Sequence, residues 1–267
     1  GGNAIDAAVA ASFVEGLVNP QMHTIGGECP ILVRLAGESR VISVNGNMAA
    51  PAKATPEAFR ARGLADIPDS GILAAGVPAA FGALVTALQK WGTMPLRDVI
   101  APAIELAKQG FPVSEGLRNQ HKYGIGPMKA RFEAEWPGSA KLYLPLPEVG
   151  ARFRNPALAR TFEYLAAAKD PLAAFYQGEV AAEIAKFSRE KDGFLSRDDL
   201  AALAMAAVAQ PGAFAINLLV VGLPEESNGV VERLGELIAR HRPFGQAGKD
   251  RVTKRQDAGP PGYQDSH

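Results

Sequence analysis

Hydrophobic residues recur at helical spacing over most of this chain, and β-branched runs occur in only a few places. The first such stretch, Ala4–Val18, follows Asn3, a residue type that often caps helices. It is apolar or small on every side, and Asp6 and Glu15 carry its only charges. This pattern predicts a helix that is buried all round and ends at Asn19-Pro20.

A β-hairpin is predicted directly after this helix. The run Cys29–Leu35 and the run Arg40–Asn45 are rich in Val, Ile and Leu, and a short link that contains glycine separates them. The glycine pair Gly26-Gly27 therefore stands between a buried helix and the first strand.

The rest of the chain is mostly helical in pattern. A short apolar strand is predicted in "SGILAAG", and a last strand at Phe214–Gly222. The segment 111–153, which is rich in Pro, Gly and aromatic residues, predicts short helices and loops. Further helices are predicted from Thr55-Pro56, from near Pro78 to Trp91, from Pro95 to Gly110, from Asn155-Pro156 to Ala168, from about Glu179, from Ser196, and over 229–241.

Helices dominate this order and strands are few, which predicts an α+β fold with an incomplete sheet. We expect a partner segment to supply the remaining strands. The chain opens directly at the entrance of a buried helix, so we also expect its N-terminus to be cut rather than native.

Composition removes several classes of function. The 267 residues include 28 basic and 28 acidic side chains, so the formal net charge is zero, without the basic excess of a nucleic-acid binder. The one basic run, Lys249–Asp257, is broken by acids and predicts a solvated tail. No apolar run approaches the roughly 20 residues of a membrane-spanning helix.

The stretch "HTIGGECP" at residues 23–30 gathers the most reactive side chains of the chain. A dinucleotide loop would need a strand, then glycines, then a helix, and the order here is reversed. A Cys29/His23 nucleophile pair is one hypothesis, although a free cysteine at the mouth of an apolar strand more often packs as a small core residue. A metal site would need ligands beyond His23, Glu28 and Cys29, so a tight glycine turn is the leading local interpretation.

Six blocks of the sequence, taken in order, resemble the large-subunit half of the γ-glutamyltranspeptidase (glutathione hydrolase) family. The resemblance covers about residues 1–240, and the block from Gly76 to Val113 is its most specific part. The blocks are "GGNAIDAAVA", "NPQMHTIGGECPILV", "APAKATPEAF", "GVPAAFGALVTALQKWGTMPLRDVIAPAIELAKQGFPV", "FYQGEVAAEIAKF" and "DGFLSRDDLAA".

The resemblance implies an N-terminal-nucleophile amidohydrolase with a four-layer αββα sandwich. In that family the precursor cuts itself before a threonine, and the new N-terminal threonine attacks the γ-glutamyl amide with its own α-amine as the base. The acyl group then passes to water or to an amino acid or peptide. The resemblance implies no metal or organic cofactor, and its partners are a small γ-glutamyl or other amide substrate and a small-subunit segment.

The chain departs from the family where the chemistry should be. The family nucleophile lies in a Thr-Thr-His-type motif and its oxyanion hole uses a glycine pair of the small subunit, and neither that motif nor that small-subunit pair is part of this chain. We therefore expect residues 1–242 to form a partial large-subunit domain, residues 243–267 to form a disordered polar tail, and the chain alone to be inactive. The six threonines, none of them in such a motif, are Thr24, Thr55, Thr86, Thr93, Thr161 and Thr253.

Candidate substrate-binding residues follow from the same alignment of motifs. Asn47 stands where the family has an arginine that can pair with the substrate α-carboxylate, and asparagine cannot form that ion pair. Gly26 and Gly27 stand in a glycine run that lines the family's active cleft, so we expect them to shape its wall. The Asn47 difference makes an amidohydrolase or acylase for another small amide a second hypothesis, and a non-catalytic remnant or interaction piece is a third.

Overall fold

The computed structural model of this protein describes residues 1–206, and these are mainly helical. The helix-rich α+β composition expected from the sequence is confirmed there, with two small two-stranded sheets. The elements are α1 Ala4–Val18, β1 Ile31–Val33, β2 Ile42–Val44, α2 Pro56–Ala61, the 3₁₀ helix η1 Ile72–Ala74, α3 Ala80–Trp91, α4 Leu96–Gln109, β3 Phe111–Pro112, α5 Glu115–Asn119, α6 Ile125–Ala134, α7 Pro137–Tyr143, β4 Arg152–Phe153, α8 Pro156–Ala167, α9 Pro171–Tyr176, α10 Glu179–Glu190 and α11 Arg197–Ala206.

Helix α1 begins where the sequence predicts it. The Asn3 side chain accepts hydrogen bonds from the backbone N–H groups of Ile5 and Asp6, and the Asp6 carboxylate accepts one from the Asn3 N–H. This reciprocal pair satisfies N–H groups that have no partner within the helix. Burial on every side, however, is not found in the described part of the chain, because Ala7, Ala8 and Ala11 remain exposed.

Asp6 also joins α1 to the segment that precedes α4. Its carboxylate accepts hydrogen bonds from the Thr93 hydroxyl at 2.6 Å, the Thr93 N–H at 2.9 Å and the Met94 N–H at 3.1 Å. Thr93 is therefore occupied by Asp6, and Pro95 takes the capping position of α4. The predicted helix from Pro95 to Gly110 therefore begins one residue later, at Leu96.

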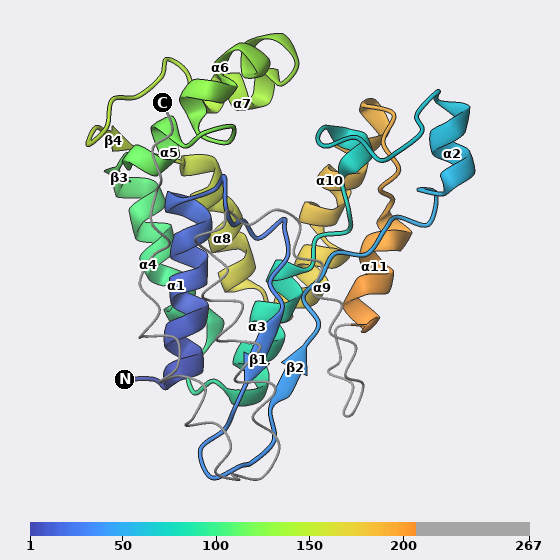
Figure 1. Cartoon of the computed structure of the whole chain (residues 1–267). Coiled ribbons are helices and arrows are strands. Elements are labelled where there is room, and N and C mark those ends of the chain that lie inside the picture. The colour runs from blue at the N-terminus through green and yellow to red at the C-terminus, as the bar shows by residue number, and fades with distance from the viewer. Residues whose placement is uncertain (207–267) are drawn as a thin grey trace, which may run out of the picture. The chain divides into compact units, whose positions relative to one another are not determined.

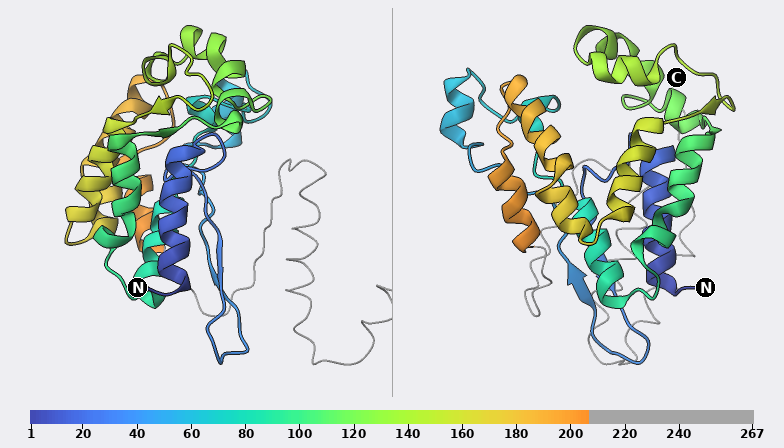
Figure 2. Two further views of the ribbon diagram at one scale, coloured as in Figure 1. Left: turned by 90° about the vertical axis from the view of Figure 1, so that its left-hand side faces the viewer. Right: turned by 180° about the vertical axis from the view of Figure 1, so that it is seen from behind.

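Strands β1 and β2 form the predicted hairpin but are shorter than the two apolar runs. They pair in antiparallel register, with Ile31 opposite Val44 and Leu32 opposite Ser43. Val33 and Val44 are buried on one face, whereas Leu32 and Ser43 share the exposed face. The hairpin turn reaches past the N-terminal end of α1 (Figures 1 and 2).

The main core lies among helices α1, α3, α4 and α8 and also includes residues of α9, α10 and α11. Helix α4 packs against both α1 and α8, and the left view of Figure 2 shows it between them. The Phe13 ring of α1 meets the Phe81 ring of α3 and the Phe162 ring of α8 edge to face, at centroid distances of 6.2 and 5.7 Å. Helix α3 packs into this core through four buried residues, Phe81, Leu84, Val85 and Leu88.

The strand predicted in "SGILAAG" is wrong. Residues 72–74 form the 3₁₀ helix η1, and the preceding Gly71 has φ +89°, a conformation that suits glycine. Val77, three residues after η1, makes an isolated bridge to Ala49. A run of four apolar residues between two glycines was too short to specify a strand.

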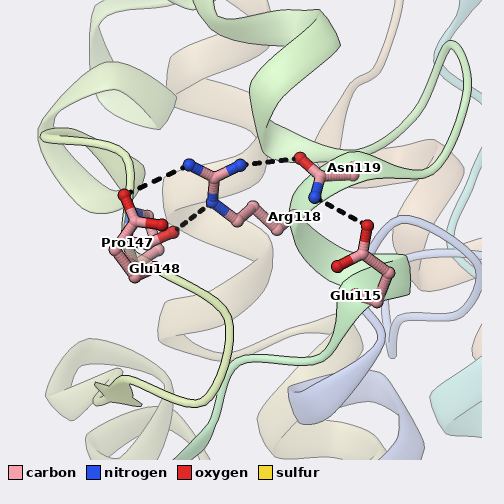
Figure 3. A network of polar contacts seen from close by, with 5 residues as sticks. All are labelled: Glu115, Arg118, Asn119, Pro147 and Glu148. Atoms are coloured by element: carbon pink, nitrogen blue, oxygen red, sulfur yellow. Dashed lines mark hydrogen bonds and ion pairs between the residues drawn. The ribbon is translucent and has the colours of Figure 1, made fainter.

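The segment 111–153 contains short helices and loops, as predicted, and one arginine anchors the loop before β4. The Arg118 guanidinium of α5 donates to the Pro147 carbonyl at 2.8 Å, to Glu148 at 3.2 Å and to the Asn119 side chain at 2.8 Å (Figure 3). Asn119 in turn donates to Glu115. The loop before β4 is thereby held against α5.

The helical pattern of residues 155–206 is confirmed. Asn155 caps α8, and Ser196 forms the expected capping pair with Asp199 at the start of α11. The segment before α10 is a short helix, α9, rather than a turn. The predicted strand Phe214–Gly222, the helix over 229–241 and the tail 243–267 lie outside the described residues.

Candidate functional site

The glycine pair forms a tight turn whose N–H groups are already used. The Gly26 N–H donates to the Thr24 hydroxyl at 2.9 Å, and the Gly27 N–H donates to the Thr24 carbonyl at 3.1 Å. An oxyanion hole or anion site needs free backbone donors. These two donors are satisfied within the turn, so the turn acts through its shape and its carbonyl groups.

The Gly27 carbonyl caps helix α3 from a distant segment. It accepts hydrogen bonds from the N–H groups of Ala79 and Ala80, at 3.0 and 2.9 Å. Helix α3 has no side-chain cap of its own, and its first N–H groups need partners outside the helix. The glycine turn is therefore fixed to the helix that carries much of the main core.

The loop that carries Asn47 lies against the glycine turn. The Cys29 N–H donates to the Gly46 carbonyl at 2.9 Å, and the Met48 N–H donates to the Glu28 carboxylate at 2.8 Å. The structure thus brings Gly26, Gly27 and Asn47, the three residues singled out from the sequence, into one neighbourhood. Whether they bind substrate remains a prediction.

Gly46 permits this close approach because it has no side chain. A Cβ atom there would lie 1.9 Å from the Cys29 carbonyl oxygen and 2.9 Å from the Ala83 side chain. Any other residue would push the Asn47 loop away from the glycine turn. The sequence showed only a glycine next to Asn47 and gave no sign of this contact.

Asn47 itself faces solvent and is oriented by its neighbour. Its side-chain amide donates to the Asn45 side chain at 2.9 Å, and its backbone N–H donates to the same oxygen at 3.2 Å. Within the residues that the structure describes, the Asn47 amide oxygen accepts no hydrogen bond. Asn47 therefore presents a neutral polar group beside the glycine turn.

His23 and Cys29 do come together, through a residue that the sequence analysis did not single out. The Ser12 hydroxyl of α1 lies 2.8 Å from the His23 Nε2, and it is near enough to the Cys29 thiol to influence its pKa. Burial lowers the pKa of His23, and the negative charge of Glu15 partly opposes this shift. Burial raises the pKa of the Cys29 thiol, against a smaller opposing effect of Ser12.

These shifts disfavour a Cys29/His23 nucleophile pair. The nucleophilic form of cysteine is the thiolate, and a raised pKa leaves less of it at neutral pH. Cys29 also packs against the main core, which agrees with its interpretation as a small core residue. We infer that the hydrogen bond between Ser12 and His23 holds the start of the glycine turn against α1.

A mainly apolar cavity of about 230 Å³ is lined by the start of the turn together with residues of α1 and α8. Thr24 and Ile25 contribute to it from the turn, and Tyr143 and Phe153 stack at a centroid distance of 5.6 Å on its wall.

Within residues 1–206, no set of three or more His, Cys, Asp and Glu side chains is placed to hold a metal ion. In the same range, no helix is both long and apolar enough to cross a membrane.

Comparison with known proteins assigns the family. The family model described as Gamma-glutamyltranspeptidase matches residues 1–246. The chain therefore belongs to the γ-glutamyltranspeptidase family, and the resemblance seen in the sequence is confirmed.

Three relatives illustrate the match. The chain is 33% identical over 209 residues to the glutathione hydrolase proenzyme of Escherichia coli, which covers 76% of this chain and 35% of that protein. It is 33% identical over 215 residues to the acylase ACY 1 proenzyme of a Pseudomonas species, with 75% and 37% covered. The crystal structure of γ-glutamyltranspeptidase from Helicobacter pylori superposes with a TM-score of 0.68 at 32% identity, over 76% of this chain and 58% of that one.

The chain spans only about a third of the length of the curated relatives that it matches. The relatives include proteins named as hydrolases and one named as an acylase, and the described structure is helix-rich with small sheets, consistent with the superposed structure.

Proposed function

We propose that this chain is the large-subunit portion of an amidohydrolase that transfers or hydrolyses the acyl group of a small amide, with γ-glutamyl amides as the family substrate. The family match over residues 1–246 carries the proposal. The fixed contact between the glycine turn and the Asn47 loop supports it, because these segments would form one wall of the substrate cleft.

The nucleophile in this proposal lies outside these 267 residues. An N-terminal threonine, freed by self-cleavage of a precursor, attacks the amide carbon, its α-amine takes the proton, and the amine leaving group departs from an acyl-enzyme. Water or an amine acceptor then releases the acyl group. The names of relatives as proenzymes agree with such a precursor.

The same proposal extends to the fold and the domains. Strands β1 and β2 would join a central sheet completed by a small-subunit segment, and helices such as α1, α4 and α8 would form one outer layer of a four-layer αββα sandwich. Residues 1–242 would form the large-subunit domain, and residues 243–267 a polar tail.

The proposal is tested by expressing the protein from its complete coding sequence and assaying γ-glutamyl p-nitroanilide. We expect a Thr-Thr-His-type motif and a glycine pair to be encoded beyond His267, and we expect turnover that is lost when that threonine is replaced by alanine. The chain of residues 1–267 by itself should not turn over the anilide. If no family-like segment is encoded, the enzyme proposal fails and a non-catalytic interaction role replaces it.

A second substrate class is favoured by one observation, the neutral Asn47. Because asparagine cannot form the carboxylate ion pair of the family arginine, an amide without an α-carboxylate is a credible substrate. Asn47→Arg should then raise kcat/KM for γ-glutamyl p-nitroanilide about tenfold, as expected for a charged hydrogen bond. Ser39→Arg, which adds the same charge in the exposed hairpin turn, serves as the control and should leave the value unchanged.

A further inference from the structure

Glu28 and Asn47, which we call the Glu28–Asn47 corner, present hydrogen-bond acceptors at the edge of the candidate site. Both residues are exposed, and the Met48 N–H that binds Glu28 belongs to the residue after Asn47. Glu28 follows Gly27 directly, so the corner adjoins the glycine turn. The hydrogen bonds from the Cys29 N–H to the Gly46 carbonyl and from the Met48 N–H to Glu28 fix its position.

The backbone donors closest to this corner are consumed by the fold. The Gly26 and Gly27 N–H groups bind Thr24, the Cys29 N–H binds the Gly46 carbonyl, and the Met48 N–H binds Glu28 itself. A ligand carboxylate that arrived here would not find these four N–H groups free. Anion recognition at a loop depends on such groups.

The remaining groups favour a ligand that donates. Glu28 uses one carboxylate oxygen, Oε1, for the Met48 N–H, and its other oxygen has no hydrogen-bond partner within residues 1–206. Within that range no Lys, Arg or His side chain forms an ion pair with Glu28. An ionised carboxylate can only accept hydrogen bonds, whereas the Asn47 amide offers its oxygen as an acceptor and its second N–H as a donor, so the preference for a donating ligand rests on Glu28.

We propose that the Glu28–Asn47 corner selects the substrate: it favours an amide whose acyl chain ends in an ammonium or a neutral donor and disfavours one that ends in a carboxylate. This inference rests on the proposed amidohydrolase function and specifies its substrate class. Glu28 acts here as a specificity-determining residue, because its charge attracts a cation and repels an anion. A single exposed charge pair of this kind is worth a factor of about five in binding.

The test compares three p-nitroanilides of equal chain length with the protein expressed from its complete coding sequence. Their acyl groups are 5-aminopentanoyl, pentanoyl and glutaryl, which end in an ammonium, a methyl and a carboxylate. We expect kcat/KM for the ammonium substrate to exceed that for the carboxylate substrate by about fivefold or more. Preference for the carboxylate would overturn the inference.

Two variants separate the charge of Glu28 from general effects. Glu28→Gln keeps an oxygen for the Met48 N–H but removes the charge, and it should reduce the ammonium-to-carboxylate ratio about fivefold. Glu105→Gln removes the same charge from the exposed face of α4 and should leave the ratio unchanged. A ratio that does not change in Glu28→Gln would also overturn the inference.

A binding measurement distinguishes this inference from the proposed function. If neither γ-glutamyl p-nitroanilide nor any of the three anilides is turned over, the proposed function fails; turnover of the γ-glutamyl anilide alone leaves it standing. Isothermal titration of the same protein with the three corresponding primary amides then tests the corner directly. The ammonium amide should bind most tightly, and equal affinities, no binding, or tightest binding of the carboxylate amide would refute selection by Glu28.

Discussion

At the scale of single residues, the polar groups inside the fold differ sharply in how well they are satisfied. Asp6 is only 3% exposed and accepts bonds from Asn3, Thr93 and Met94, so its charge is compensated by donors. Ser188 of α10 is fully buried, and its hydroxyl has no partner within the described residues. The two residues therefore predict opposite effects on stability.

Asp6→Asn should destabilise the protein and flatten its response to acid. The hydrogen bond from the Thr93 hydroxyl, with further N–H donors and against the effect of burial, lowers the pKa of Asp6 from 3.8 to about 2. A lowered pKa gives stability that is present above about pH 4 and is lost as the pH falls towards about 2. The melting temperatures of Asp6→Asn and the native protein should therefore converge over that range.

The exposed Asp98 at the start of α4 provides the control for this prediction. Asp98→Asn should follow the native protein in its acid response. If the difference between Asp6→Asn and the native protein stays constant from about pH 6 to about pH 2, the charge of Asp6 does not carry the stability.

Ser188→Ala should raise the free energy of unfolding by about 1 kcal/mol, because it removes a buried hydroxyl without a hydrogen bond. Urea denaturation measures the change. Ser114→Ala provides the opposite case, since the Ser114 hydroxyl accepts a bond from the Leu117 N–H at the start of α5 and its loss should cost about 1 kcal/mol. A destabilised Ser188→Ala variant would mean that the hydroxyl has a partner.

At the scale of elements, helix α3 depends on two distant segments for its start. The Gly27 carbonyl accepts from Ala79 and Ala80, and the Tyr176 hydroxyl of α9 accepts from the Gly82 N–H at 3.1 Å while donating to the Pro78 carbonyl at 2.9 Å. The helix therefore couples the candidate site to the core. Glycine at position 82 leaves room for that hydroxyl, which would lie 2.6 Å from a Cβ atom.

Tyr176→Phe should cost about 1–3 kcal/mol of unfolding free energy, because it leaves a buried N–H and a buried carbonyl without a partner. Burial raises the pKa of Tyr176 to about 12, so the hydroxyl keeps its proton in the folded state at neutral pH. Urea denaturation gives the value. Tyr123→Phe, at an exposed position, should change stability by less than about 0.5 kcal/mol, and similar losses in both variants would argue against the bridge.

At the scale of the whole molecule, the exposed face of the β1–β2 hairpin predicts self-association of the chain of residues 1–267. Within the described residues this sheet has only two strands, and Leu32 on its outer face is 43% exposed. Unpaired strand edges beside an exposed apolar residue promote pairing between chains. Sedimentation velocity should therefore show mass that rises with concentration.

Leu32→Lys should weaken this association about tenfold, because it replaces an apolar contact by a charge at the edge. Ile67→Lys changes an equally apolar and more exposed side chain, at 65%, outside the hairpin and should have no effect. A native chain that sediments as a monomer at every concentration would refute the prediction.

The sequence by itself determined the local elements and the family. A helix cap or a glycine stop depends on only a few neighbouring residues. Helices α1, α2, α8 and α11 therefore begin close to the predicted starts at Asn3, Thr55, Asn155 and Ser196, and α4 ends close to Gly110. Six ordered motifs sufficed to indicate the γ-glutamyltranspeptidase family, which the comparison confirmed. The strand predicted before Gly76 does not form. Whether so short an apolar run becomes a strand depends on a partner strand elsewhere in the fold, which the run itself does not specify.

Only the tertiary structure decided what surrounds the candidate residues. The contact of Gly46 with Cys29, the cap that Gly27 gives to α3, and the bond between Glu28 and the Met48 N–H each join segments that are 17 to more than 50 positions apart. No local pattern encodes such contacts, because they depend on where the backbone runs after packing. That packing places the Glu28–Asn47 corner beside the glycine turn.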